Sequence, residues 1–179
     1  MNGNLHFVFA GACTSMVALN LDKITALGLN IEANAATATL IIMGGLIGGI
    51  FPDIDNPKSH MGQLSKPVST IIGKISGFMG KKGCMHRGVC HDFSLYLAGL
   101  VWSYFFFPPM TGFFLGALSH LLLDAFNPMG VPVLFGASTL HLGRIYAGSK
   151  AASLFVWAAT FLVIGIGVAV HTGLCEGII

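Results

Sequence analysis

The sequence predicts an all-α, polytopic membrane protein in which about five apolar helices form one bundle. Two features of its composition support this fold class: 54% of the 179 residues are hydrophobic and only 9% are charged. Ordinary soluble domains carry about 25% charged residues. The length is sufficient for a single domain, residues 1–179, with a sizeable buried core.

Five apolar segments supply the predicted helices: residues 5–21, 35–51, 93–107, 110–126 and 151–170. A helix needs about 20 residues to cross the hydrocarbon core, and only the last segment clearly reaches that length. One or two of the others could therefore be re-entrant or buried in protein. Pro108 and Pro109 separate the third segment from the fourth, which predicts a tight helical hairpin.

The first segment has no Lys or Arg before Lys23, so it lacks the positive region of a signal peptide and is expected in the mature protein. Eight of the nine basic residues fall in two loops, 52–92 and 127–150: Lys58, Lys66, Lys74, Lys81, Lys82, Arg87, Arg144 and Lys150. Positive charge concentrates on the cytoplasmic side of membrane proteins. We therefore expect a cytoplasmic N-terminus and cytoplasmic loops. The net charge of +2 is too small to predict a nucleic-acid partner.

Seven potential metal ligands lie near the predicted cytoplasmic ends of these segments: His6, Asp53, Asp55, His86, His91, His120 and Asp124. The orientation was assigned from lysines and arginines, so it is independent of these residues. Imidazole and carboxylate together suit Zn²⁺, with Mn²⁺ or Fe²⁺ as alternatives. The sequence thus predicts a metal site at the cytoplasmic face, with one ion or two.

The most specific pair is His120 with Asp124, inside the apolar stretch "SHLLLD". Residues four apart share one face of a helix, with Cβ atoms about 5–6 Å apart. Ionisable groups within a membrane cost about 2.5–3.5 kcal/mol even on insertion scales and are functional by default. A shared cation would give both side chains a partner.

The other pairs depend on the backbone. Asp53 and Asp55 point alike only in an extended segment, which Pro52 and Pro57 favour; otherwise each is an ordinary cap or turn former. His86 and His91 are five residues apart and can bind one ion only if the glycine at position 88 breaks the helix.

Several features have simpler interpretations. Taken singly, His6 and His86 would be interfacial histidines, and we interpret the remaining histidines in that way: His60, His141 and His171. Arg87 could belong only to the positive cytoplasmic set. The motif "GGLIGGIF" favours close helix packing over a phosphate cradle, because no Lys-Ser/Thr pair follows it.

Together with His6, four motifs, "PDIDNPKS", "HRGVCH", "SHLLLD" and "NPMGVPVLF", resemble one family in content and order: the YdjM-like, LexA-regulated, metal-dependent hydrolases of the bacterial inner membrane. The motif around His120 is also similar, less specifically, to zinc-dependent phospholipases C. Two departures stand out. Cys90 and Asp92 flank His91 where the family usually has Thr and Ser, and Phe135-Gly136 stands where it usually has Trp-Pro.

The residues and the resemblance together suggest a hydrolase in the bacterial inner membrane. Its expected substrate is an ester or phosphodiester, for example that of a lipid-linked compound. A bound metal would activate water. Asp53 would be a further ligand, bridge a second ion or act as general base, and Arg87 would stabilise an anionic transition state. The alternatives are a non-enzymatic metal-binding scaffold and, ranked last, a small ion transporter.

Overall fold

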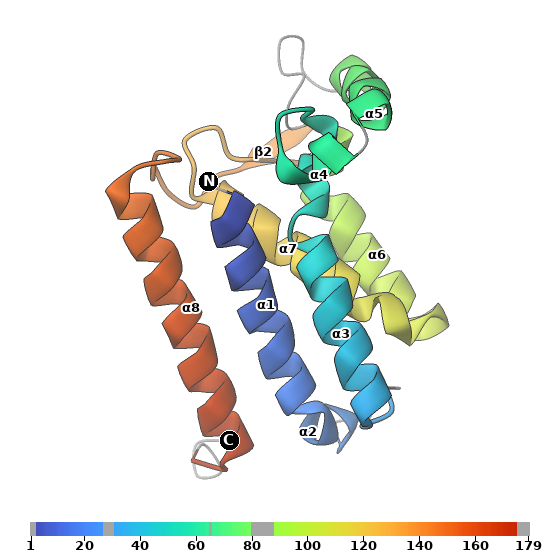
Figure 1. Cartoon of the computed structure of the whole chain (residues 1–179), viewed down its shortest axis with the longest axis vertical. Coiled ribbons are helices and arrows are strands. Elements are labelled where there is room, and N and C mark those ends of the chain that lie inside the picture. The colour runs from blue at the N-terminus through green and yellow to red at the C-terminus, as the bar shows by residue number, and fades with distance from the viewer. Residues whose placement is uncertain (1–2, 27–30, 65, 80–87, 175–179) are drawn as a thin grey trace.

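A computed structural model describes residues 3–26, 31–64, 66–79 and 88–174 of the chain and is mostly helical (Figure 1). Each predicted apolar segment contains one main helix. These are α1 (Gly3–Leu19), α3 (Ala35–Gly48), α6 (Phe93–Phe106), α7 (Thr111–Ala125) and α8 (Lys150–His171). The short helix α2 (Leu21–Ala26) follows α1. The all-α prediction therefore describes the class correctly.

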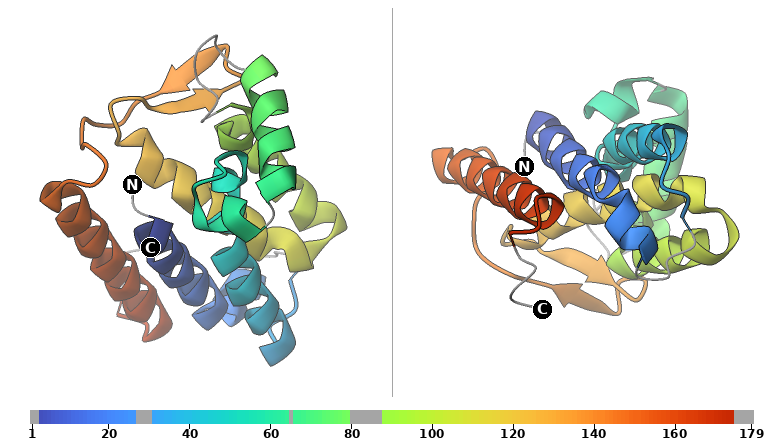
Figure 2. Two further views of the ribbon diagram at one scale, coloured as in Figure 1. Left: turned by 45° about the horizontal axis from the view of Figure 1, so that its top comes forward. Right: turned by 90° about the horizontal axis from the view of Figure 1, so that it is seen from below.

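Helix α1 lies between α8 and α3, and the three run side by side (Figure 1, Figure 2). Helix α7 crosses them and packs against α1, α3 and α6. Ten of its 15 residues are buried. The helix that carries His120 and Asp124 is thus the core helix of the bundle, and protein rather than lipid surrounds the two side chains.

Glycines let the backbones of α7 and α3 come into direct contact. A Cβ atom at Gly48 would lie 2.0 Å from the carbonyl oxygen of Phe113, and one at Gly116 would lie 2.1 Å from that of Gly45. Neither distance is possible for a real side chain. The interpretation of "GGLIGGIF" as a close-packing motif is therefore confirmed.

The predicted hairpin between the third and fourth segments is also confirmed. The single 3-10 turn η3 (Pro108–Met110) joins α6 to α7, and the two helices contact each other. Proline is well placed here because the first turn of a helix needs no backbone N–H.

The two loops contain more structure than the sequence predicted. Residues 51–64, 66–79 and 88–91 contain the 3-10 helix η1 (Phe51–Asp55), α4 (His60–Leu64), α5 (Lys66–Met79) and the 3-10 helix η2 (Val89–His91). The second loop forms an antiparallel hairpin, β1 (Val131–Val133) with β2 (Ser138–Leu140), in which Val131 pairs with Leu140. The expected extended backbone at Asp53 and Asp55 is wrong, because Pro52 occupies the first turn of η1 and its fixed φ suits a helix start.

Two helical stretches are long and apolar enough to cross a membrane, residues Ala35–Asp55 and Lys150–His171. Two shorter apolar helices, Gly3–Leu19 and Phe93–Phe106, accompany them. The N-terminal end of α1, the helices α4 and α5, and the hairpin all lie at one end of the bundle, and the end of α8 lies at the other (Figure 1).

Candidate metal centre

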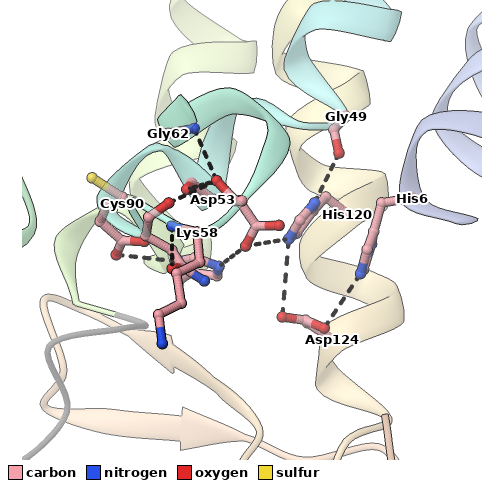
Figure 3. A network of polar contacts seen from close by, with 12 residues as sticks. His6, Gly49, Asp53, Lys58, Gly62, Cys90, His120 and Asp124 are labelled. Atoms are coloured by element: carbon pink, nitrogen blue, oxygen red, sulfur yellow. Dashed lines mark hydrogen bonds and ion pairs between the residues drawn. The ribbon is translucent and has the colours of Figure 1, made fainter. Parts of the chain in front are cut away.

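Six of the predicted ligands come together at that end of the bundle (Figure 3). His6 belongs to α1, Asp53 and Asp55 to η1, and His91 to η2; His120 and Asp124 belong to α7. Four segments that are distant in sequence therefore supply one cluster. His86 and Arg87 lie outside the described residues. None of His60, His141 and His171 belongs to either group of side chains that could hold a metal ion.

The α1–α7 part of the cluster consists of two histidines and a carboxylate. The Nε2 atom of His120 lies 3.9 Å from Oδ2 of Asp124, as expected for residues four apart on a helix. The Nε2 atom of His6 lies 3.6 Å from the other carboxylate oxygen, Oδ1. The rings of His6 and His120 are stacked, with centroids 3.8 Å apart. Asp124 therefore faces both imidazoles at once.

The η1–η2 part is centred on His91. Its Nε2 atom lies 3.4 Å from Oδ1 of Asp53, and its Nδ1 atom lies 3.6 Å from Oδ2 of Asp55. The same Oδ1 atom of Asp53 lies 3.8 Å from Nε2 of His120. Asp53 thus connects the two parts, whereas Asp55 contacts the far side of the His91 ring.

The orientation of His120 is fixed by the backbone. Its Nδ1 atom lies 2.8 Å from the carbonyl oxygen of Gly49 (Figure 3). A carbonyl can only accept, so Nδ1 carries the proton and donates it, which leaves the lone pair of Nε2 directed at Asp53 and Asp124. This is the usual arrangement behind a metal-binding histidine. No sequence motif indicated the role of Gly49.

Solvent reaches the cluster mainly through one residue. The side chain of Asp53 is 19% exposed, while those of the three histidines are at most 1% exposed. Burial by itself would lower the pKa of His91, but the interactions with Asp53 and Asp55 outweigh burial and raise that pKa to about 9. The two carboxylates therefore stabilise positive charge at this position, whether a proton or a coordinated cation carries it.

The donor atoms fit a divalent metal ion. Tetrahedral zinc with bonds of about 2.0–2.1 Å places its ligand atoms roughly 3.3–3.4 Å apart. The pairs in the cluster lie 3.4–3.9 Å apart, which is longer than typical hydrogen bonds. Within the described residues, Nε2 of His120 and Nδ1 of His6 are buried without a hydrogen-bond partner. A buried polar atom without a hydrogen-bond partner is unusual, and a bound cation would be the partner of Nε2 of His120.

Two overlapping groups of side chains could hold an ion: His6 with His120 and Asp124, and Asp53 with His91 and His120. His120 belongs to both. His120 can bind one ion through its Nε2 atom. The two groups therefore describe either one ion shared by all five side chains, or two ions of which only one is bound by His120.

Hydrogen bonds to side-chain hydroxyls hold the loops that carry these ligands. The hydroxyl of Ser59 donates to the carbonyl oxygen of Asp53 at 2.7 Å and accepts from the N–H of Gly62 at 2.9 Å. The hydroxyl of Tyr96 donates to the carbonyl oxygen of Cys90 at 3.0 Å, next to His91. The ligand-bearing turns are thus fixed by the protein itself.

Asp92 connects the site to the hairpin. Its Oδ1 atom caps α6 by accepting from the N–H groups of Ser94 and Leu95, at 3.0 and 3.3 Å. Its Oδ2 atom accepts from the N–H of Gly136 at 3.3 Å. Gly136 has φ +81°, a conformation suited to glycine, in the turn between β1 and β2. One buried carboxylate therefore holds the start of α6 and the hairpin turn together.

Comparison with known proteins identifies the family of this chain. The YdjM inner membrane protein family matches residues 1–174. The inner membrane protein YdjM of Escherichia coli (strain K12) is 35% identical over 103 residues, which are 53% of this chain and 48% of that protein; the YdjM protein of Shigella flexneri gives the same values. The uncharacterized protein YvsG of Bacillus subtilis (strain 168) is 29% identical over 99 residues, 54% of this chain and 57% of that protein.

The chain thus spans about half the length of the curated relatives it matches. No solved structure matches it. Because the family match extends over nearly the entire sequence, the chain belongs to the YdjM inner membrane protein family.

Proposed function

We propose that the protein is a metal-dependent hydrolase embedded in the bacterial inner membrane, with its site at the cytoplasmic face and its N-terminus in the cytoplasm. The five apolar helices α1, α3, α6, α7 and α8 form the membrane-embedded bundle, of which two stretches have full spanning length. The observation that supports this proposal most is the buried His/Asp cluster. Its nitrogen and oxygen atoms lie 3.4–3.9 Å from one another, close to the spacing of ligand atoms around one metal ion.

The ion is held by His120 and Asp124 on α7, with His6, His91 and Asp53 supplying further ligands. Zn²⁺ is the first choice for this nitrogen and oxygen set, and Mn²⁺ or Fe²⁺ are the alternatives. Asp55 acts behind His91 and sets the orientation of its ring, as carboxylates commonly do for metal-binding histidines. A second ion would use the group that contains Asp53 and His91.

Such an ion, when bound, lowers the pKa of a coordinated water toward neutrality and so supplies a nucleophile. The chain contributes a buried site in which the imidazoles are at most 1% exposed. Asp53, which solvent reaches, is placed to accept a proton from water if it does not itself bind the ion. Arg87, outside the described residues, would stabilise an anionic phosphoryl group.

The substrate class follows from the position of the site. It lies at one end of an apolar bundle, level with the headgroups if that bundle spans the bilayer. An ester or phosphodiester of a lipid or of a lipid-linked compound could reach it from the leaflet. A water-soluble substrate would instead approach through Asp53.

The first experiment is metal analysis of the detergent-purified protein beside His120→Ala and Asp124→Ala, with Ser119→Ala as the control. Ser119 is buried on the same helix, but its hydroxyl donates to the carbonyl oxygen of Gly116. We expect metal in the wild type and in the control, and a loss in both ligand variants. Equal metal content in all four proteins would contradict the ligand assignment. A panel of ester and phosphodiester substrates, with and without chelator, then tests for hydrolysis.

A scaffold that binds metal without catalysis is the second candidate. The observation in its favour is that His6, His120 and Asp124 are all buried, which is typical of closed structural sites. A filled site with no chelator-sensitive turnover would select this function. An ion transporter is disfavoured because residues 35–51 and 151–170 contain no ionisable side chain.

A further inference from the structure

Helix α5 (Lys66–Met79) presents a different kind of side chain on each of three faces. Ser69 and Gly73, four residues apart, are buried against the rest of the protein. Val68, Ile71 and Ile75 are exposed. The remaining face carries polar and basic residues, among them the exposed Lys66 and Lys74. The sequence suggested only a polar loop here, whereas the structure contains an amphipathic helix whose apolar side is open.

The small-residue face fixes α5 to the metal centre. A Cβ atom at Gly73 would lie 2.6 Å from the carbonyl oxygen of Asp55, so the helix rests directly on the backbone of η1. A Cβ atom at Gly62, in the neighbouring α4, would lie 2.0 Å from the carbonyl oxygen of Asn56. No side chain separates α5 from the segment that carries Asp53 and Asp55. The position of α5 and the position of these carboxylates are therefore coupled.

The apolar face is a continuous stripe. Val68, Ile71 and Ile75 have the spacing i, i+3, i+7, which places them on one side of a helix. They are 46%, 59% and 56% exposed, and Leu64 just before the helix is 79% exposed. Side chains of this kind normally pack against protein or lipid. Within the described residues, this stripe packs against neither the bundle nor the hairpin closely enough to become buried.

The orientation of α5 indicates what covers the stripe. In Figure 1, the axes of α1, α3 and α8 lie in the plane of the picture, whereas α5 is seen close to end-on, at the end of the molecule where α1 begins. A helix that crosses the axes of membrane-spanning helices at their end lies along the membrane surface. An apolar stripe beside a basic polar face is the composition of an interfacial helix, and Lys66 and Lys74 complement anionic headgroups.

We propose that α5 is an interfacial membrane helix: the face formed by Val68, Ile71 and Ile75 inserts into the lipid leaflet, and Lys66 and Lys74 contact its anionic headgroups. Through the contact of Gly73 with Asp55, the helix then holds the metal centre at headgroup depth. This inference rests on the membrane position given under Proposed function, but it requires neither a bound metal nor hydrolysis. A second copy of the chain and a soluble partner are the occupants that it excludes.

The test uses spin labels on the full-length protein in lipid nanodiscs. The four native cysteines are first replaced by alanine, and a nitroxide is attached to Ile71→Cys or, as a matched control, to Thr70→Cys on the polar face that carries Lys66 and Lys74. Collisions with oxygen report lipid, and collisions with a water-soluble nickel chelate report water. We expect the label at position 71 to lie about 5–10 Å below the headgroup boundary and the label at position 70 to lie in water.

Two outcomes would overturn the proposal. Equal access of nickel to both labels would place the stripe in water, and a label at position 71 shielded from nickel and oxygen alike would place it under protein.

The headgroup contact is tested by comparing anionic with zwitterionic nanodiscs. The label should shift toward water without anionic lipid, and also in Lys66→Gln/Lys74→Gln; an unchanged depth in both cases would overturn this contact.

Metal content is measured on the same samples. A label at the expected depth in protein that binds no metal would leave the interfacial helix in place and contradict only the proposed hydrolase. Metal binding in a protein whose label at position 71 lies in water would contradict the interfacial helix and leave the proposed metal site in place. The two proposals therefore fail separately.

Discussion

The imidazole Nδ1 atom of His120 donates a hydrogen bond of 2.8 Å to the carbonyl oxygen of Gly49. Gly49 caps the C-terminal end of α3, and its own N–H is bonded to the carbonyl oxygen of Gly45. The end of one helix therefore sets the tautomer and the ring orientation of a candidate ligand on another. The glycine itself is required because a Cβ atom there would lie 2.3 Å from that of Ala10.

Replacing Gly49 by alanine should weaken metal binding although no ligand is removed. The added methyl group has to displace α1 or the Gly49 carbonyl, and changes behind a ligating histidine typically cost about 10- to 100-fold in metal affinity. Competition with a chelating dye measures the affinity. Gly165→Ala in α8 is the control, since a Cβ atom there has no neighbour within 4 Å. Wild-type affinity in a folded Gly49→Ala protein would contradict the role assigned to the carbonyl.

Asp55→Asn should also lower metal affinity by about 10- to 100-fold, because it removes the charge that faces Nδ1 of His91. The exposed carboxylate Asp22, in α2 at the other end of the bundle, provides the control Asp22→Asn. The same competition assay applies to both variants. Equal affinities would show that His91 does not depend on Asp55.

Chelation should destabilise the wild-type protein. A ligand that binds only the folded state, present at 100 times its dissociation constant, adds about 2.7 kcal/mol to the free energy of unfolding. Removing it should lower the thermal midpoint in detergent. His120→Ala and Asp124→Ala should start from a lower midpoint and respond little to chelator. An equal response of the wild type and both variants would mean that the chelator acts elsewhere.

Asp92 should contribute to stability through two separable contacts. Asp92→Ala removes the cap of α6, at a typical cost of about 1 kcal/mol, and also the contact with Gly136. Asp92→Asn keeps one oxygen for the cap but places an amide N–H₂ against the N–H of Gly136. Denaturant titration in detergent micelles should therefore give the order wild type, Asn, Ala. Identical midpoints for the two variants would contradict the assignment of separate roles.

The apolar runs of the sequence indicated where the main helices lie, because each run is bounded by polar residues or by Pro108 and Pro109. The sequence also predicted that His120 faces Asp124, since that follows from helical geometry alone. Helices that are apolar on every side carry no periodic signal for their packing faces. The stacking of His6 on His120 therefore had no signature in the sequence.

The loops were less predictable for a different reason. The 3-10 helix η1 packs against α5, and α5 lies in a segment whose Gly, Ser and Lys residues suggested a polar loop. The stripe of Val68, Ile71 and Ile75 was nevertheless visible in the printed sequence as a helical period. Contacts to a backbone carbonyl, such as that of Gly49, leave no trace in residue type.

The hydrogen bond between Gly136 and Asp92 joins two segments that are 44 residues apart in the chain. A proline at position 136 would have no N–H and could not adopt φ near +81°, so it would remove the contact with Oδ2 of Asp92 and leave only the cap of α6. The residue at position 136 therefore decides whether the hairpin turn is tied to the segment that carries His91.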